Sequence, residues 1–233
     1  MRIQSILNKK GVTLIELLVV LVITAITMAG IYRVFIYQTK TYAIQDQVMD
    51  VQQNVRGAME ILLRDLRMTG FDDDNPNSDV TIANPLLTPV QASDITINYE
   101  YYERSLVGTE AQRYQSHQVR YWRDAGTSTL RRTITRDAAA TTETILDNVN
   151  ALTFTYGIDR NNDGMMDDQN GNGQIDANDW LTAAGVVALG NPKVIAVNVS
   201  LTGRSDQTNI DVSKVVSPRT LVSAVTLRNL SLR

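Results

Sequence analysis

An unbroken apolar run near the N-terminus constrains this chain of 233 residues more than any other feature. From Val12 to Ile31 almost every residue is apolar, and Glu16 is the only charged one. Twenty residues of helix rise about 30 Å, which matches the hydrocarbon thickness of a bilayer. An ionised side chain inside such a span costs about 2.5–3.5 kcal/mol on insertion scales, so Glu16 calls for a specific role.

A short basic leader precedes the run, and Gly11 stands at the join. The leader contains Arg2, Lys9 and Lys10 and no acidic residue. By the positive-inside rule, this charge places the leader in the cytoplasm and the remainder of the chain outside the inner membrane. A plain secretory signal is disfavoured, because its apolar core usually has roughly 7–15 residues and ends in small residues at a cleavage site.

Beyond Gly30 the pattern becomes amphipathic. Apolar residues recur at steps of three and four, as they do on one face of a helix. No proline interrupts residues 12–69, so we expect one helix of about 85 Å that stops at Gly70. Residues 12–37 would form its transmembrane half, and residues 38–70 its amphipathic half. The apolar positions of the amphipathic half are Ile44, Val48, Val51, Val55, Ala58, Leu62 and Leu66.

Residues 71–233 are predicted to form a β-rich globular domain in the periplasm or outside the cell. Several segments alternate between apolar and polar residues, which is typical of half-buried strands. Because these segments follow one another without intervening helices, we expect an antiparallel sheet that packs on the helix, hence an α+β fold. The expected strands are 95–101, 119–123 and 130–136 (a hairpin), 152–158, 195–201 and 221–230.

The charge of the chain limits its function. The formal net charge is −3, and it becomes −6 once residues 1–11 are removed. An acidic protein of this kind is not a typical nucleic-acid binder, which usually carries a basic surplus. The chain has no cysteine, so disulfides and thiol chemistry are excluded.

The N-terminal motif resembles the class III signal of type IV prepilins and pseudopilins. It runs Lys9-Lys10-Gly11-Val12-Thr13-Leu14-Ile15-Glu16-Leu17-Leu18, with a basic leader, a glycine and an apolar run that contains one carboxylate. The resemblance implies cleavage between Gly11 and Val12, N-methylation of Val12 and assembly into a filament. The family usually has phenylalanine where Val12 stands, and this chain departs from the pattern at that position.

Two further segments extend the resemblance. The run Arg64-Asp65-Leu66-Arg67-Met68-Thr69-Gly70-Phe71 is similar to the helix end of PilW-like minor pilins and of the related J-type pseudopilins. The run Ala224-Val225-Thr226-Leu227-Arg228-Asn229 looks like their closing strand. The resemblance implies a type IV pilin-like fold and a low-abundance subunit of a complex that primes pilus assembly near the filament tip. A J-type minor pseudopilin of a type II secretion system is the near alternative.

The resemblance also implies partners and a role for Glu16. The carboxylate of Glu16 would pair with the positively charged N-terminal amine of a neighbouring subunit in the filament core. The expected partners are other minor pilins, the major pilin, the prepilin peptidase and the inner-membrane assembly platform. The protein would be a single-pass inner-membrane protein with a periplasmic domain before assembly, and would lie in the pilus at the cell surface afterwards.

Residues 159–179 contain two overlapping copies of a calcium-loop pattern. Calcium takes about six to eight oxygen ligands, and an EF-hand-type loop supplies them from places 1, 3, 5, 7, 9 and 12, with glycine at place 6. The second copy fits every place, with Gly173 at the sixth and Ile175 as the apolar pin at the eighth. Its ligands would be Asp168, Asn170, Asn172, the carbonyl of Gln174, Asp176 and Asp179.

The first copy is incomplete, because Asn170 stands where the closing acid belongs. Asp179, which closes the second copy, is shorter than the usual glutamate, and this indicates a weak or structural site with Kd of roughly 10⁻⁴–10⁻³ M. We expect Ca²⁺ as a cofactor; the alternative is a solvated Asp/Asn/Gly loop that binds no metal. The ligands of the first copy would be Asp159, Asn161, Asp163, the carbonyl of Met165 and Asp167.

Arginines interleaved with Tyr114, Tyr121 and Trp122 raise the possibility of a nucleic-acid surface, and a calcium-dependent adhesin or DNA-binding tip protein is therefore a second alternative. The negative net charge argues against it, so nucleic acid is not expected among the partners. The chain has no G-x-S-x-G or phosphate-loop pattern and a single histidine, His117, so we do not expect an enzyme. The arginines are Arg113, Arg120, Arg123, Arg131, Arg132 and Arg136.

Overall fold

The computed structural model describes residues 11–72, 76–104, 106–136, 139–205 and 216–231. The predicted leader, apart from Gly11, lies outside the described residues. The chain forms two compact units, residues 1–46 and residues 47–233.

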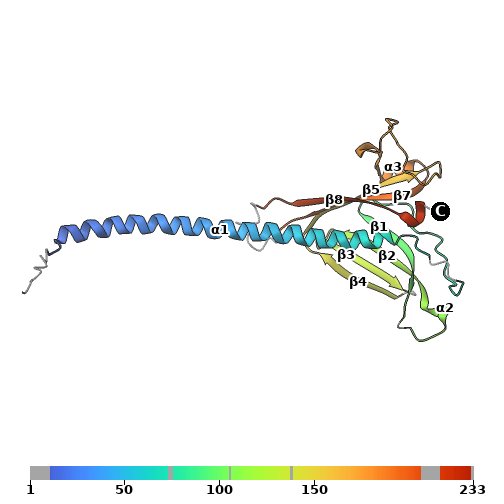
Figure 1. The fold of residues 1–233 in the computed structure, drawn as a ribbon, viewed down its shortest axis with the longest axis horizontal. Helices are drawn as coiled ribbons and strands as arrows, with labels where there is room; N and C mark the ends of the chain where they lie inside the picture. Colours follow the sequence, from blue (N-terminus) through green and yellow to red (C-terminus); the bar gives the residue numbers. More distant parts are fainter. Residues whose placement is uncertain (1–10, 73–75, 105, 137–138, 206–215, 232–233) are drawn as a thin grey trace, which may run out of the picture. The chain divides into compact units, whose positions relative to one another are not determined.

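One long helix, α1 (Leu14–Arg67), crosses the boundary between the two units (Figure 1). The predicted helix is thereby confirmed to within two residues at each end. Gly30 lies inside the helix without interrupting it. In the first unit every residue from Gly11 to Lys40 is exposed, whereas the buried residues of α1 all lie in the second unit, from Val51 to Leu66.

The C-terminal end of α1 is closed by contacts from distant parts of the chain. Gly70 takes a left-handed conformation with φ of 71°, which favours glycine, and its N–H donates to the carbonyl of Asn98 at 2.9 Å. The side-chain amide of Asn229 donates to the carbonyl of Thr69 at 3.1 Å. The C-terminal segment thus bonds a carbonyl just beyond the last turn of the helix, and the sheet bonds the N–H of Gly70.

Two antiparallel sheets of four strands each make up the body of the second unit. The first sheet contains β1 (Asp94–Tyr102), β2 (Tyr114–Asp124), β3 (Thr129–Arg136) and β4 (Ala139–Leu146) in that order. Each strand pairs with the next along the chain, so this sheet is a meander.

The second sheet has the order β6-β5-β7-β8. Its strands are β5 (Val149–Asp159), β6 (Leu181–Thr182), β7 (Lys193–Gly203) and β8 (Arg219–Thr226). Long stretches of β5 and β7 are buried, and Leu152 lies opposite Leu201. The short helices of the second unit are α2 (Glu110–Arg113), η1 (Ala177–Asp179), α3 (Ala183–Ala188) and α5 (Arg228–Ser231).

The α+β class is confirmed, but three details of the predicted sheet were wrong. The strands form two sheets rather than one. Strand β4 was not predicted, because residues 139–144 lack an apolar alternation. The last strand ends at Thr226 instead of Leu230, because α5 begins at Arg228.

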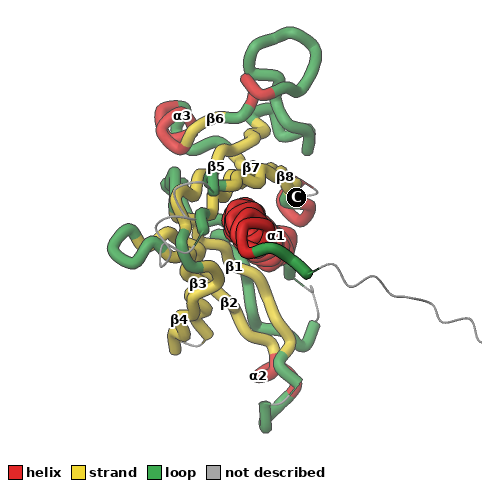
Figure 2. The backbone as a smooth tube through the Cα atoms, turned by 90° about the vertical axis from the view of Figure 1, so that its left-hand side faces the viewer, coloured by secondary structure: helices red, strands yellow, loops and turns green. Residues whose placement is uncertain are grey.

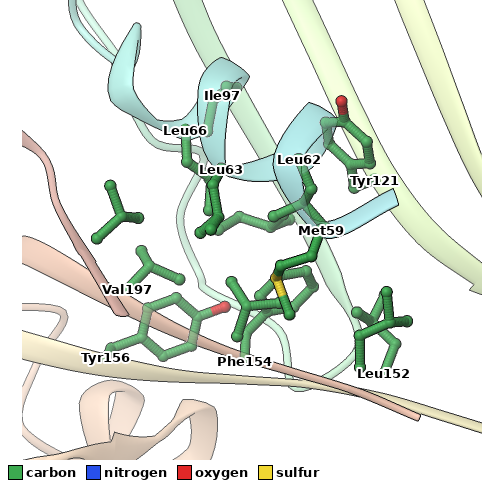
Figure 3. Close-up of a cluster of buried hydrophobic side chains, with 14 of the residues drawn as sticks. Met59, Leu62, Leu63, Leu66, Ile97, Tyr121, Leu152, Phe154, Tyr156 and Val197 are labelled. Atoms are coloured by element: carbon green, nitrogen blue, oxygen red, sulfur yellow. The ribbon is translucent and has the colours of Figure 1, made fainter. Parts of the chain in front are cut away.

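The core of the second unit lies where α1 meets both sheets (Figures 2 and 3). Leu62 and Leu66 of α1 have no exposed surface. They belong to the same buried cluster as side chains from the first sheet and the second sheet. Burying one such Leu, Ile or Phe side chain contributes about 1.5–3 kcal/mol, so this shared face holds the unit together. The sheet residues labelled in Figure 3 are Ile97, Tyr121, Leu152, Phe154, Tyr156 and Val197.

A buried ion pair fixes α1 on the first sheet. Asp65 of α1 lies 2.6 Å from the guanidinium of Arg132, and the hydroxyl of Tyr121 donates to the same carboxylate at 2.7 Å. The two paired side chains are only 6% and 13% exposed. Arg132 also contacts Glu143 at 2.9 Å. Burial and the adjacent Asp65 carboxylate raise the pKa of Tyr121, which therefore stays a hydrogen-bond donor.

We predict that Asp65→Ala lowers the free energy of unfolding by about 3–5 kcal/mol, because it leaves a buried guanidinium and a buried hydroxyl short of a partner. Urea unfolding of the full chain in detergent, followed by the fluorescence of Trp122 and Trp180, measures this cost. The neighbouring Arg64→Ala is the control, since Arg64 is 69% exposed and its contact with Asp65 should contribute less than about 1 kcal/mol. Equal effects of the two substitutions would contradict the assigned role of Asp65.

Candidate functional sites

The predicted processing site lies directly before the first turn of α1. Gly11 and Val12 precede the helix, and both are exposed. No atom of the described residues lies within 4 Å of where a Cβ on Gly11 would stand. The peptide bond between these residues is therefore in an accessible, non-helical segment, as a protease requires of its substrate.

Thr13 caps the helix that follows. The backbone N–H of Glu16 donates to the side-chain oxygen of Thr13 at 3.3 Å. This satisfies one of the N–H groups that a helix N-terminus leaves without a partner. The Glu16 carboxylate lies in the first turn, near the positive end of the helix dipole. This cap was not predicted, although the spacing Thr-x-x-Glu is its usual signal.

The apolar half of α1 is of membrane-spanning length and composition. The hydroxyls of Thr24 and Thr27 are hydrogen-bonded within the helix, because each donates to a carbonyl four residues earlier at 2.8 Å. Glu16 is then the one ionisable side chain between Val12 and Ile31. Within the described residues, no ion pair involves its carboxylate.

The acidic segment forms the connection between β5 and β6, at the end of the second sheet (Figures 1 and 2). Each copy of the pattern contains an equivalent hydrogen bond, in which the residue at the sixth place donates to the side chain at the first place. Gly164 donates its N–H to Asp159 at 3.0 Å, and Gly173 donates to Asp168 at 2.5 Å. Both glycines have φ near +80°, which favours glycine. The predicted turns at the sixth places are therefore present.

The copies also match at the later places. In each, the side-chain oxygen at the third place accepts the N–H of the fifth, and that at the fifth place accepts the N–H of the seventh. These bonds hold the side chains at alternate positions on the inside of a tight loop. The accepting residues are Asn161 and Asp163 in the first copy, and Asn170 and Asn172 in the second.

The copies differ in how their charges are neutralised. In the first, Lys193 of β7 lies 3.8 Å from the buried Asp159, and Arg160 contacts Asp167 at 3.0 Å. In the second, no lysine or arginine of the described chain forms an ion pair with Asp168, Asp176 or Asp179. Only the second copy thus keeps three carboxylates without a protein cation.

Asp179 closes the second copy from a fully buried position. Its two oxygens accept the N–H groups of Gln169 at 2.7 Å and Asp176 at 2.6 Å, and so join the two ends of the loop. Neighbouring backbone N–H groups also lower the pKa of two partly exposed carboxyls. Gly173 is the main donor to Asp168, and Asn178 to Asp176. Both remain ionised to a lower pH than an ordinary aspartate.

The donor chemistry of the second copy suits calcium, because each of its proposed ligands offers a carboxylate, amide or backbone carbonyl oxygen. The carboxylates are not gathered, however: among the described residues, no three His, Cys, Asp or Glu side chains are placed to hold a metal ion. Ile175, expected as the apolar pin, is 51% exposed, so that expectation was wrong.

The arginines of the first sheet are largely neutralised. Arg120 forms an ion pair with Asp94, Arg131 lies 3.5 Å from Asp124, and Arg113 lies 3.4 Å from Glu110. Arg120 and Arg131 also lie over the ring of Trp122, with guanidinium carbons 5.4 and 5.6 Å from its centre. Their charges are used within the sheet, which does not favour a phosphate-binding surface.

Comparisons with known proteins match both ends of the chain. Residues 6–32 match the prokaryotic N-terminal methylation motif, and residues 117–228 match the family described as type IV pilus-assembly protein W. The solved structure of the type IV-like pilin TTHA1219 from Thermus thermophilus is similar at 12% identity and a TM-score of 0.45, with 77% of this chain and 97% of that one covered. A comparison with curated proteins finds no match.

The methylation motif includes Gly11, Val12 and Glu16, and the PilW match spans the chain from β2 to the start of α5. These two matches support a PilW-like type IV minor pilin with a prepilin-type N-terminus.

Proposed function

We propose that this protein is inserted in the inner membrane, cleaved between Gly11 and Val12, N-methylated on Val12, and built into a type IV pilus as a minor subunit. In this function it takes part in priming assembly and occupies a place near the filament tip. The observation that carries the proposal is the exposed Gly11–Val12 junction, followed at once by a capped apolar helix with a single carboxylate.

Cleavage creates the positive charge with which the Glu16 carboxylate can pair. Hydrolysis of the Gly11–Val12 peptide bond leaves a carboxylate on Gly11 and an amine on Val12. The amine, methylated and protonated, remains near the first turn of its own helix and close to the level of Glu16 in a neighbouring subunit. Two opposite charges attract strongly in an apolar filament core, and an unpaired one is costly there. The pair would therefore set the axial register between subunits.

The exposed apolar surface of α1 suits a subunit that moves from lipid into a filament. From Leu14 to Ile36 the large apolar side chains are exposed, most of them by half or more. Lipid tails and neighbouring pilin helices are both apolar, so the exchange requires no refolding of this segment. The partners in this proposal are the prepilin peptidase, the inner-membrane assembly platform, other minor pilins and the major pilin.

A J-type pseudopilin of a type II secretion system uses the same N-terminal chemistry and remains the alternative. Gene neighbourhood separates the two, since the chain would be encoded beside pilus genes in one case and secretion genes in the other. Loss of pili, as opposed to loss of secretion, on deletion of the gene separates them by phenotype.

We further propose that the second copy of the acidic loop binds Ca²⁺ through Asp168, Asn170, Asn172, Asp176, Asp179 and the carbonyl of Gln174. Three features support it: the complete ligand spacing, the inward-facing hydrogen bonds shared with the first copy, and the absence of a described cation beside its carboxylates. Calcium would supply the positive charge that Lys193 and Arg160 supply to the first copy.

We predict that intact-mass measurement of the membrane protein shows a chain starting at Val12 and carrying one methyl group. Gly11→Ala should leave the chain uncut yet inserted, because the apolar run is unchanged. Gly30→Ala is the matched control: Gly30 also has open space around it, and its replacement should not affect cleavage. An uncut wild-type chain, or a cut beyond Ile31, would refute the processing site.

We predict that Glu16→Ala inserts in the membrane at least as well as wild type but joins the pilus poorly, as measured by immunoblots of sheared pili against membranes. Thr13→Ala separates pairing from capping, because it removes the cap and keeps the carboxylate. It should fray the helix start, at about 0.5–2 kcal/mol, and still assemble. Normal assembly of Glu16→Ala would exclude the pairing role.

We predict that the full chain in detergent melts at a higher temperature in millimolar calcium than in chelator. Binding to the folded state alone stabilises by about 2.7 kcal/mol at a hundredfold excess over Kd. Asp168→Asn and Asp176→Asn should remove most of this difference. Asp159→Asn should destabilise the protein equally with and without calcium, because Asp159 already pairs with Lys193. If the melting temperature is the same in calcium and in chelator, the loop is a solvated turn that binds no calcium.

A further inference from the structure

The two edges of the first sheet differ in whether another segment of the chain pairs with them. The outer edge of β1 is covered, because residues 70–71 and 85–87 exchange backbone hydrogen bonds with it. Four such bonds span the strand, at 2.7–2.9 Å. They run from Leu87 to Thr96, from Asn98 to Pro85, from Gly70 to Asn98 and from Glu100 to Phe71.

The outer edge of β4, at the other end of this sheet, is open (Figure 2). In the part of the chain that the structure describes, no backbone hydrogen bond joins β4 to any segment other than β3. Every residue from Ala139 to Thr144 is exposed. An open edge presents a row of N–H and C=O groups that pairs readily with another strand. Proteins usually guard such an edge with lysine or proline, and β4 contains neither.

A groove of about 900 Å³ begins where β4 ends. One wall is formed by Thr144, Ile145 and Leu146 of β4, and the other by α1, including Ala58 and Ile61. Because the groove continues from the open edge, a strand added to β4 would place side chains of one face against α1. On the added strand, the side chains that lie beside Ala58 and Ile61 would be apolar.

The charge of the groove narrows the choice of occupant. Asp50 and Asp147 line it, and neither forms an ion pair in the described structure, whereas Arg204 is the only described lining residue with a positive charge. The incoming strand should therefore carry a lysine or arginine near Asp147. Strand β4 itself has Glu143 and no basic residue, so a second copy of this chain would bring an acidic strand to an acidic groove.

We infer that the open edge of β4 and the adjoining groove are a docking surface for an extended strand of a different subunit, with apolar side chains toward α1 and a basic side chain near Asp147. Main-chain hydrogen bonds to the edge supply the attachment, and the groove selects the side chains. The inference rests on the proposed function, because it names the surface through which the minor pilin joins a neighbour.

Photo-cross-linking in cells tests the surface on the full chain. Benzoylphenylalanine replaces Thr142 or Ala140 on the open edge, and replaces Ala125, an exposed residue of the turn between β2 and β3, as a matched control. We expect light to produce an adduct with a different protein from the two β4 positions and none from Ala125. No adduct from β4, a dimer of this chain, or a link within a single chain would each overturn the inference.

Charge reversal supplies a second readout. Asp147→Lys should reduce the yield of the Thr142 adduct at least severalfold, whereas Asp79→Lys, an exposed reversal in the segment between α1 and β1, should not. Equal yields would overturn the charge argument. Processing and pilus incorporation are scored in the same cells. A chain that is processed and incorporated yet gives no adduct refutes the docking surface alone, and a chain that is never processed refutes the proposed function.

Discussion

The second unit depends on the apolar face that α1 presents to both sheets. Leu62 and Leu66 are completely buried there, among side chains of β1, β2, β5 and β7. The helix covers the inner face of each sheet, so removing the helix would expose both faces. Asp65 fixes the position of the helix on the first sheet, because its bonds to Arg132 and Tyr121 can form at only one position of the helix. Apolar burial supplies the stability, and the ion pair supplies the register.

Much of this arrangement could be predicted from the sequence, and the failures have physical reasons. The buried positions of α1 repeat every three or four residues, and Val51, Val55, Ala58, Leu62 and Leu66 were all expected. Alternation shows which residues of a strand face inward, but not which strands pair, so the division into two sheets was hidden. Strand β4 has no alternation, because both of its faces are exposed over most of its length. Its extended form comes from pairing with β3.

The acidic loop shows the same limit at the level of a site. The ligand spacing of both copies could be read from the chain, and the hydrogen bonds at places one, three, five and six follow it. What distinguishes the copies is Lys193, which lies beside Asp159 only because β7 pairs with β5. Neutralisation by a residue distant in sequence cannot be read from a local pattern.

The bond from Asn229 to the end of α1 joins residues 160 positions apart in the chain. The long helix is made first and the segment that closes it is made last, so no part-finished chain can complete this domain. Until Asn229 has been made, the end of the helix lacks this partner. Subunits truncated before Asn229 are therefore left with an open helix end that a folded subunit does not show.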